Sequence, residues 1–394
     1  MTPARHRVVR AAAVGAAVGG GAAVVAGAAV STAAAYFARR VVTPDRTLSD
    51  DVEVLMVGAG TLTLAATPET VAPGRYGLWL AKGSGHARLG EVVEKDVRAG
   101  TVTRALEQVD TGRLAAGPAR WNQYYFSGTP SSALGMTHQD VIVTSDAGEL
   151  PTWYVPPSDE VARRDVWAIL VHGRGATREE CLRAIPLLHR LGMPVLVPSY
   201  RNDPEGPVTH RGRVSLGDTE WQDVEAAVLH ALDEGASEVV LFGWSMGGAI
   251  VLQQVSRSWT ADRVRALVLD SPVIDWKDVL EHHAQLNKLP RPVSRLGLMM
   301  LADEAWRRVV GTDAAVDLRR LDWVTRASEL RLPVLLVHSD DDEFVPSRPS
   351  RRLAQARPDL VTFVGFPHAR HCKEWNTDPD RWEREVARFL LQHL

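Results

Sequence analysis

Ser245, a serine between two glycines, is the clearest candidate nucleophile in the chain. It stands in a G-W-S-M-G run from Gly243 to Gly247, between the apolar residues 239–242 and an apolar, helix-compatible segment. This order predicts a strand, a sharp turn and a helix, with the serine at the apex of the turn. The chain packs so closely there that only glycine fits two residues before and two residues after the apex. The turn lifts the hydroxyl clear of the sheet and places it at the positive end of the next helix.

A serine hydroxyl is a weak nucleophile at neutral pH, so this use of Ser245 requires a base and an acid from elsewhere in the chain. An imidazole must take the proton during attack and return it to the leaving group, and a carboxylate must orient that imidazole. Two histidines after the last predicted strand could be the base, His368 and His371. Four carboxylates that follow predicted strands could be the acid: Asp270, Asp340, Asp341 and Asp342.

From residue 139 onward, predicted strands and helices alternate. A hairpin is predicted over 141–155, and further apolar strands are predicted at 166–171, 194–197, 239–242, 264–269, 333–337 and 360–364. Helices are predicted near 178–191, near 219–234 with Asp218 as the N-cap, after the serine, and over 379–394. Apolar strands that alternate with helices are typical of an α/β fold, in which helices cover both faces of a parallel sheet.

This region resembles the α/β-hydrolase superfamily over roughly residues 137–394. The resemblance rests on four motifs in the family's order, namely the serine turn at 243–247, a V-H-G-R-G run at 171–175, an acid turn at 337–346 and a histidine ahead of the last helix. Serine, acid and histidine follow one another along the chain as in that family. The resemblance implies an α/β-hydrolase fold with a mostly parallel central sheet, helices on both faces and a helical lid at about 273–330.

The resemblance also implies which carboxylate and which histidine act with the serine. The family places its carboxylate three residues before a Val-Pro pair, which selects Asp342 among its neighbours. His371 is preferred to His368 as the base. Ser339 stands where glycine is usual in this turn, a departure that leaves the proposed triad intact.

Two backbone N–H groups are implied as the oxyanion hole, those of Arg174 in the V-H-G-R-G run and of Met246 directly after the serine. Preorganised donors of this kind stabilise the charge that develops on the substrate oxygen. The chemistry needs no cofactor and no metal. The neighbouring His282 and His283 lack a third ligand at workable spacing for a metal site.

Residues 41–133 show a different pattern, with short predicted strands separated by Gly and Pro. Strands of this kind indicate a small antiparallel sheet or a partial barrel. No catalytic group of residues stands out there, so the sequence predicts an accessory β-rich region whose role it leaves open.

Composition excludes some partners and leaves other questions open. A net charge of −3 and the lack of a Lys/Arg-rich patch argue against nucleic-acid binding. The two cysteines, Cys181 and Cys372, match no metal spacing and no disulfide scaffold. Whether they pair is left open by the sequence.

Residues 1–40 are predicted to be an uncleaved transmembrane anchor. Three arginines precede an uncharged Ala/Val/Gly-rich run at 11–37, and Arg39 and Arg40 close it. The run exceeds the roughly 20 residues that a spanning helix needs and the about 7–15 apolar residues of a signal peptide. The predicted location is the cell membrane, with the N-terminus inside and the catalytic domain outside the cytoplasm. The alternative is a signal peptide cut near residues 33–35.

Together these features predict a membrane-anchored serine hydrolase that cleaves a carboxylic ester through an acyl-enzyme. The predicted partners are a small-molecule ester or peptide and the membrane. One alternative is a serine peptidase similar to prolyl oligopeptidase, which shares the catalytic core and often carries a β-rich N-terminal module. Another is a non-catalytic binding protein on the same fold, because fold alone does not determine function.

Overall fold

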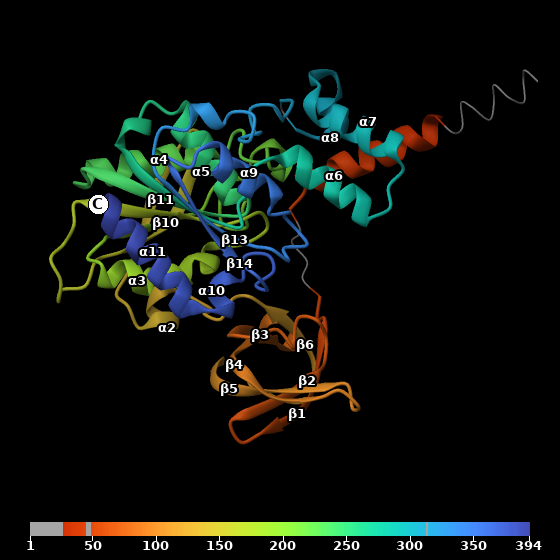
Figure 1. Cartoon of the computed structure of the whole chain (residues 1–394), viewed down its shortest axis with the longest axis vertical. Helices are drawn as coiled ribbons and strands as arrows, with labels where there is room; N and C mark the ends of the chain where they lie inside the picture. The colour runs from red at the N-terminus through yellow and green to blue at the C-terminus, as the bar shows by residue number, and fades with distance from the viewer. Residues whose placement is uncertain (1–26, 45–48, 313) are drawn as a thin grey trace, which may run out of the picture.

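The computed structural model describes residues 27–44, 49–312 and 314–394. Within these ranges an eight-stranded sheet forms the centre of a large domain, and a small closed barrel precedes it in the chain (Figure 1). The large sheet has the order β14-β13-β12-β11-β9-β10-β8-β7. Its strands are β7 Gln139–Ser145, β8 Gly148–Val155, β9 Val166–Val171, β10 Val195–Pro198, β11 Glu238–Trp244, β12 Val264–Asp270, β13 Val334–Ser339 and β14 Val361–Phe366.

The sheet is mostly parallel, as the apolar strands predict. Only the pairs β7–β8 and β8–β10 are antiparallel, and β10, β9, β11, β12, β13 and β14 run in parallel. Alternate residues of one strand enter two different apolar clusters. In β11, for example, Val239 and Leu241 belong to one cluster and Val240 and Phe242 to the other. Because successive side chains of a strand point to opposite faces, both faces of this sheet are buried.

Helices cover each face. The cluster with Leu241 includes residues of α4 Trp221–Asp233, α5 Met246–Arg257 and α9 Arg348–Ala356, and the opposite cluster includes residues of α3 Ile185–Arg190 and α11 Pro379–His393. Shorter elements complete the domain: α2 Pro130–Leu134, η2 Arg178–Ala184, η3 His210–Gly212, η4 Ala261–Arg263 and α10 Glu374–Thr377.

Two helix predictions require correction. The helix predicted near 178–191 is a 3₁₀ segment, η2, followed by α3, which has a proline in its first turn. Proline lacks the N–H that a continuous helix would need there. Asp218 does not cap α4, because its carboxylate accepts hydrogen bonds from Arg257 and Arg320, each at 2.9 Å.

The predicted lid region is helical. It contains α6 Trp276–Leu286, α7 Arg291–Ala302, η5 Glu304–Trp306, α8 Arg307–Val310 and η6 Ala327–Glu329. Asp275 caps α6 with its side chain, which accepts hydrogen bonds from the N–H groups of Lys277 and Asp278. In Figure 1 this region lies at the end of the large domain farthest from the barrel.

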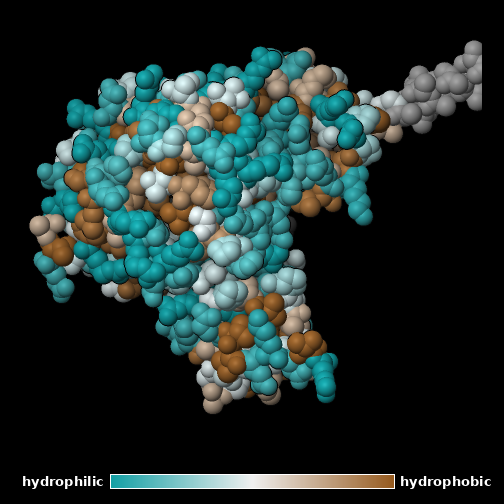
Figure 2. All heavy atoms as spheres, in the orientation of Figure 1, coloured by the Kyte–Doolittle hydropathy of each residue, from teal (hydrophilic) through white to brown (hydrophobic). Residues whose placement is uncertain are grey.

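The barrel has six strands in the closed order β1-β2-β5-β4-β3-β6. They are β1 Val52–Gly58, β2 Thr61–Ala65, β3 Tyr76–Leu80, β4 Gly85–Asp96, β5 Thr101–Thr111 and β6 Gly117–Asn122, with η1 Ala81–Gly83 between β3 and β4. Its core is a separate apolar cluster that includes Leu62, Leu78 and Leu89. Apolar side chains also gather on its outer surface (Figure 2), among them the exposed Leu55, Met56 and Val93.

Described residues 27–42 form a helix that packs on the large domain. Ala34, Ala38 and Val42 are fully buried in the same cluster as α4 and α5. The helix approaches α7 so closely that a Cβ at Gly297 would lie 2.7 Å from a ring carbon of Phe37. Residues 1–26 of the predicted anchor lie outside the described residues. Within the described ranges, no helix combines the length and apolar character that a membrane crossing requires.

Candidate active site

Ser245 occupies a strained turn between β11 and α5. Its backbone has φ 51° and ψ −116°, a conformation that residues other than glycine rarely adopt. The turn is held by its neighbours, because the Ser245 N–H donates to the carbonyl oxygen of Asp270 and the Ser245 carbonyl accepts from the Val273 N–H, each at 3.0 Å. A Cβ at Gly247 would lie 2.1 Å from the carbonyl oxygen of Val171, and one at Gly243 would lie 2.6 Å from Gly247. Both positions therefore require glycine, as the sequence predicts.

The structure brings Ser245, His371 and Asp342 together. The Ser245 hydroxyl lies 3.0 Å from Nε2 of His371, and Nδ1 of the same ring lies 2.7 Å from Oδ2 of Asp342. An ionised Asp342 can only accept, so Nδ1 carries the proton and Nε2 accepts the hydrogen bond from the serine. His368, the competing histidine, has a side chain that is 80% exposed and lies 3.8 Å from Asp341.

Asp342 is buried and held in its charged form. Its Oδ1 accepts hydrogen bonds from the N–H groups of Phe344 and Val345 at 2.9 and 2.7 Å. Nε2 of His338 lies 3.2 Å from Oδ2. Burial alone would raise the pKa of this carboxyl, but His371, His338 and the hydrogen bonds hold the pKa well below its ordinary value.

The other three candidate carboxylates have different partners. Asp340 forms an ion pair with Arg351 on the surface. Asp341 accepts hydrogen bonds from the Ser339 hydroxyl and the Arg370 N–H. Asp270 lies under the serine turn and accepts a hydrogen bond of 2.7 Å from Nε1 of Trp382.

The two predicted oxyanion donors come from the residue after the serine and from the loop after β9. Met246 is the first residue of α5, so its N–H has no acceptor within the helix. The loop after β9 passes so close that a Cβ at Gly173 would lie 3.1 Å from Cβ of Ser245. Gly173 is fixed by Glu180, whose Oε2 accepts its N–H at 2.7 Å. Arg174 follows, and its guanidinium donates to the carbonyl oxygens of Arg40 and Thr43 at 3.1 and 2.5 Å.

Ser339 has a positional role that the sequence analysis missed. Its Oγ accepts hydrogen bonds from the N–H groups of Ala369 and Arg370 at 2.9 and 3.2 Å, so it joins the acid turn to the loop that carries His371. The replacement of the usual glycine was the one signal in the sequence that could have indicated this contact.

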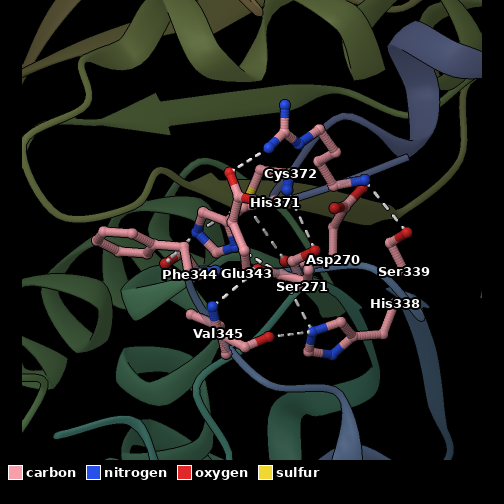
Figure 3. Close-up of polar contacts among 12 residues, drawn as sticks. Asp270, Ser271, His338, Ser339, Glu343, Phe344, Val345, His371 and Cys372 are labelled. Carbon is pink, nitrogen blue, oxygen red and sulfur yellow. Dashed lines mark hydrogen bonds and ion pairs between the residues drawn. The ribbon is translucent and has the colours of Figure 1, made fainter. Parts of the chain in front are cut away.

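The sequence analysis also missed a cluster of buried polar residues beneath His371. Nη1 of Arg183 donates to the carbonyl oxygen of Cys372 at 2.6 Å, and the Cys372 N–H donates to Oγ of Ser271 at 3.1 Å. The backbone of Cys372, directly after His371, is therefore held on both sides. Figure 3 shows Ser271 beside Cys372. Nothing in the local sequence marks Arg183, because its partner is 189 positions away. Cys181 and Cys372 are both buried and are free thiols.

Two buried carboxyl groups, Asp270 and Glu374, belong to the same polar cluster, and within the described residues Oδ1 of Asp270 and Oε2 of Glu374 have no hydrogen-bond donor. The Ser271 hydroxyl donates to Oε1 of Glu374 at 2.7 Å. Burial raises the pKa of both carboxyls, and the charge of Asp270 raises the pKa of Glu374 further. A proton held by one of these acids would give the other a donor, which agrees with the raised pKa of both carboxyls.

The lid contacts the acid turn through two histidines of α6. Nε2 of His282 donates to the Glu343 carbonyl oxygen and Nε2 of His283 donates to that of Phe344, each at 2.8 Å. The Phe344 ring lies between two imidazoles, with its centroid 4.6 Å from that of His283 and 5.1 Å from that of His371. Over the described part of the chain, no group of three or more His, Cys, Asp or Glu residues could hold a metal ion.

Comparison with known proteins places this geometry in a family. Residues 168–388 match the model of the alpha/beta hydrolase family, which is more than half of the 394 residues. The chain belongs to the alpha/beta hydrolase family. This membership confirms the resemblance that the four motifs carry. Residues 53–122 match a second family, a domain of unknown function designated DUF8805, and this match covers the barrel.

Individual relatives of this alpha/beta hydrolase are distant. The uncharacterized protein YfhR of Escherichia coli K12 is 23% identical over 251 residues, which are 63% of this chain and 78% of YfhR. The Pyrococcus furiosus esterase Pf2001 superposes with a TM-score of 0.51 at 20% identity over 68% of this chain and 94% of its own. Est1E from Butyrivibrio proteoclasticus, in a structure with bound ferulic acid, superposes with a TM-score of 0.50 at 18% identity over 64% and 98%. At such identities the two superpositions show the fold alone.

Proposed function

We propose that this chain is a serine hydrolase that cleaves carboxylic esters through an acyl-enzyme. Ser245 is the nucleophile, His371 the base and Asp342 the acid. The observation that carries the proposal is the unbroken hydrogen-bonded series from Oγ of Ser245 through the His371 ring to Asp342, with contacts of 3.0 and 2.7 Å.

The reaction follows from this geometry in two halves. Oγ of Ser245 attacks the ester carbonyl carbon while Nε2 of His371 takes its proton, and the carbonyl oxygen becomes an oxyanion facing the N–H groups of Met246 and Arg174. The oxyanion collapses, the alcohol leaves with the proton from His371, and the acyl group stays on Ser245. A water molecule then attacks the acyl-enzyme with the same base, which releases the acid and restores the serine. Asp342, held ionised, stabilises the imidazolium that forms in both halves.

Ester cleavage is proposed because the similar solved structures include esterases and one complex with ferulic acid. A small-molecule carboxylic ester is therefore the proposed substrate class. No feature of the described residues favours a peptide over an ester, since the module ahead of the catalytic domain is a six-stranded barrel.

Labelling with a fluorophosphonate probe tests the proposal. The full chain should react and should hydrolyse p-nitrophenyl esters, whereas Ser245→Ala should lose both activities, with kcat lower by on the order of 10⁶-fold. Ser256→Ala, on the same helix with its hydroxyl bound to the Gln253 carbonyl, is the matched control and should react like the wild type.

Two results would overturn the proposal. One is a folded wild-type protein that neither reacts with the probe nor cleaves esters, which would favour a binding protein on this fold. The other is undiminished labelling of Ser245→Ala. Cleavage of peptides but not esters by the wild type would keep the triad and replace the substrate class.

A further inference from the structure

The barrel reaches the active site through the loop between β2 and β3, residues 66–75. The Arg75 N–H donates to the carbonyl oxygen of Asn376 at 2.8 Å. The Asn376 side-chain amide returns the contact, donating to the carbonyl oxygens of Arg75 and Gln123 at 2.6 and 2.8 Å. Asn376 is fully buried and lies in α10, directly after the loop that carries His371. In Figure 1, α10 lies on the side of the large domain that faces the barrel.

The backbone of the barrel loop approaches the backbone of α10 so closely that the loop requires glycine at position 74. Gly74 has φ 99°, and a Cβ there would lie 2.0 Å from the carbonyl oxygen of Asn376. Behind the loop, the buried Arg104 donates to the carbonyl oxygens of Thr70 and Ala72 at 2.9 and 2.7 Å. The barrel therefore presents this loop as a rigid surface to the catalytic domain.

From that surface Glu69 contacts the residues on either side of His371. Its Oε1 lies 2.7 Å from Nη1 of Arg370, and its Oε2 accepts a hydrogen bond of 2.5 Å from Nζ of Lys373. Most of the surface of all three side chains is shielded, with 32% of Glu69, 18% of Arg370 and 13% of Lys373 exposed. One carboxylate thus binds the positions one before and two after His371.

Arg370 extends this contact to the acid turn. Its guanidinium also forms an ion pair with Glu343, the residue after Asp342. Its N–H donates to Oδ1 of Asp341 at 2.9 Å. Glu69 is therefore joined through Arg370 to both loops that carry the proposed base and acid.

The loop needs such support because its backbone is unusual. Arg370 and Cys372 have φ 62° and 52°, in the left-handed region, on both sides of His371. Residues other than glycine persist in this region only where surrounding contacts impose the conformation. A displacement of a catalytic group by about 1 Å can lower a rate by about 100-fold.

We propose that the barrel is a positioning module of the active site, and that Glu69 is a positioning residue that fixes the His371 loop by bridging Arg370 and Lys373. This inference rests on the proposed role of His371. It gives the accessory region a function in catalysis through the base rather than through contact with the substrate.

The test compares Glu69→Gln with Glu94→Gln in the full chain. Glu94 is an exposed carboxylate of β4, so the control removes the same charge from the same barrel. Glu69→Gln should lower kcat and the rate of fluorophosphonate labelling by about 10- to 100-fold, with KM for a p-nitrophenyl ester changed by no more than about two-fold because substrate contacts stay in place. Glu94→Gln should match the wild type.

A second variant approaches the same contact from the other side. Lys373→Met removes one partner of Glu69, so Glu69→Gln combined with Lys373→Met should lose less than the product of the two single losses. The two single variants, Glu69→Gln and Lys373→Met, should each keep a thermal unfolding temperature near that of the wild type. Partly exposed ion pairs add little to stability. Labelling is compared well below that temperature.

The outcomes separate this inference from the proposed function. Wild-type labelling by Glu69→Gln, or a loss that only follows the unfolded fraction, would overturn the positioning role while leaving the hydrolase in place. A wild type that does not label would contradict the proposed function instead. Hydrogen exchange of residues 370–376 then tests whether Glu69 holds the backbone of the His371 loop. Glu69→Gln should speed this exchange and Glu94→Gln should not.

Discussion

Three loops bring Ser245, Asp342 and His371 to one edge of the sheet. They follow β11, β13 and β14, whose carboxyl ends lie at the same edge of the sheet because the strands are parallel. Ligands of open α/β sheets bind at this edge. The choice between neighbouring candidates is made by hydrogen bonds, since only His371 lies within 3.0 Å of the serine hydroxyl and 2.7 Å of a carboxylate.

At the residue scale, His371→Ala and His368→Ala separate the two histidines. His371→Ala removes the base, so kcat should fall by on the order of 10⁶-fold, as it does when a serine protease loses its histidine. The exposed His368 contacts only Asp341 among the ion pairs of this turn, so His368→Ala should stay within about two-fold of the wild type. Steady-state ester hydrolysis measures both. Equal losses in the two variants would contradict the assignment.

The carboxyl pair beneath His371 makes stability depend on pH above the ordinary carboxyl range. Glu374 is buried beside Asp270, with Arg183, Glu180 and Asp342 as the other charged groups that act on the pair, and its pKa is raised. The folded protein therefore holds this proton more tightly than the unfolded chain does. The resulting stability is fully present below the ordinary carboxyl pKa of about 4.3, and it is lost as the pH rises through the raised value.

Glu374→Gln tests this dependence, because an amide fills the same space and cannot ionise. Its thermal unfolding temperature should fall less than that of the wild type as the pH rises from the ordinary carboxyl pKa of about 4.3. Glu374→Ala should be destabilised at every pH by about 1–3 kcal/mol, since it leaves the buried Ser271 hydroxyl without its acceptor. Glu281→Gln, at an exposed position of α6, is the control and should keep the wild-type pH profile. Parallel profiles for Glu374→Gln and the wild type would exclude a shared proton.

At the element scale, local patterns predict the parts of the site that local chemistry determines. The serine turn is readable because two glycines are required by backbone contacts within a few ångströms, at Gly243 and Gly247. The strands are readable because burial on both faces leaves uninterrupted apolar runs. Asp342 is selected by its spacing from the Val-Pro pair, which the family resemblance supplies.

Contacts between distant elements could not be read in this way. Asp218 has the residue type of an N-cap, yet it binds Arg257 and Arg320, which are 39 and 102 positions away. Arg183 and Glu69 likewise act through partners 189 and 304 positions away. Such contacts depend on how the elements pack, and no periodicity or spacing in one sequence encodes them.

The lid region contacts the turn that carries Asp342, the proposed acid. His282 and His283 of α6 bind two successive carbonyls directly after Asp342. Burial lowers the pKa of His283, which keeps its imidazole neutral near pH 7. A movement of α6 would therefore displace the turn that carries Asp342, the proposed acid.

At the scale of the whole molecule, three separate parts of the chain converge on the site. The barrel loop holds the His371 loop through Glu69. The lid holds the acid turn. The helix at 27–42 holds the loop after β9, because carbonyl oxygens at its C-terminal end accept hydrogen bonds from Arg174. Regions outside the central sheet thus contact each of the loops proposed to carry acid, base and oxyanion donor.

The N-terminal helix should therefore affect catalysis as well as stability, and Ala38→Glu in the full chain tests this. Ala38 is fully buried against the large domain, so a carboxylate there is unpaired and should force the helix to undock. Arg174 would then lose two carbonyl acceptors and the loop that carries its N–H would loosen. Loss of one oxyanion donor costs about 10²- to 10³-fold, so a partly loosened loop should slow fluorophosphonate labelling by about 10- to 100-fold.

Ala33→Glu is the matched control, because Ala33 is exposed on the same helix and does not pack on the large domain. It should label at the wild-type rate and leave hydrogen exchange of residues 34–42 unchanged, whereas Ala38→Glu should speed that exchange. If Ala38→Glu frees the helix in the exchange experiment and still labels like the wild type, the helix contributes to stability alone. If both effects appear together, the helix at 27–42 also positions the loop that carries the proposed oxyanion donor Arg174.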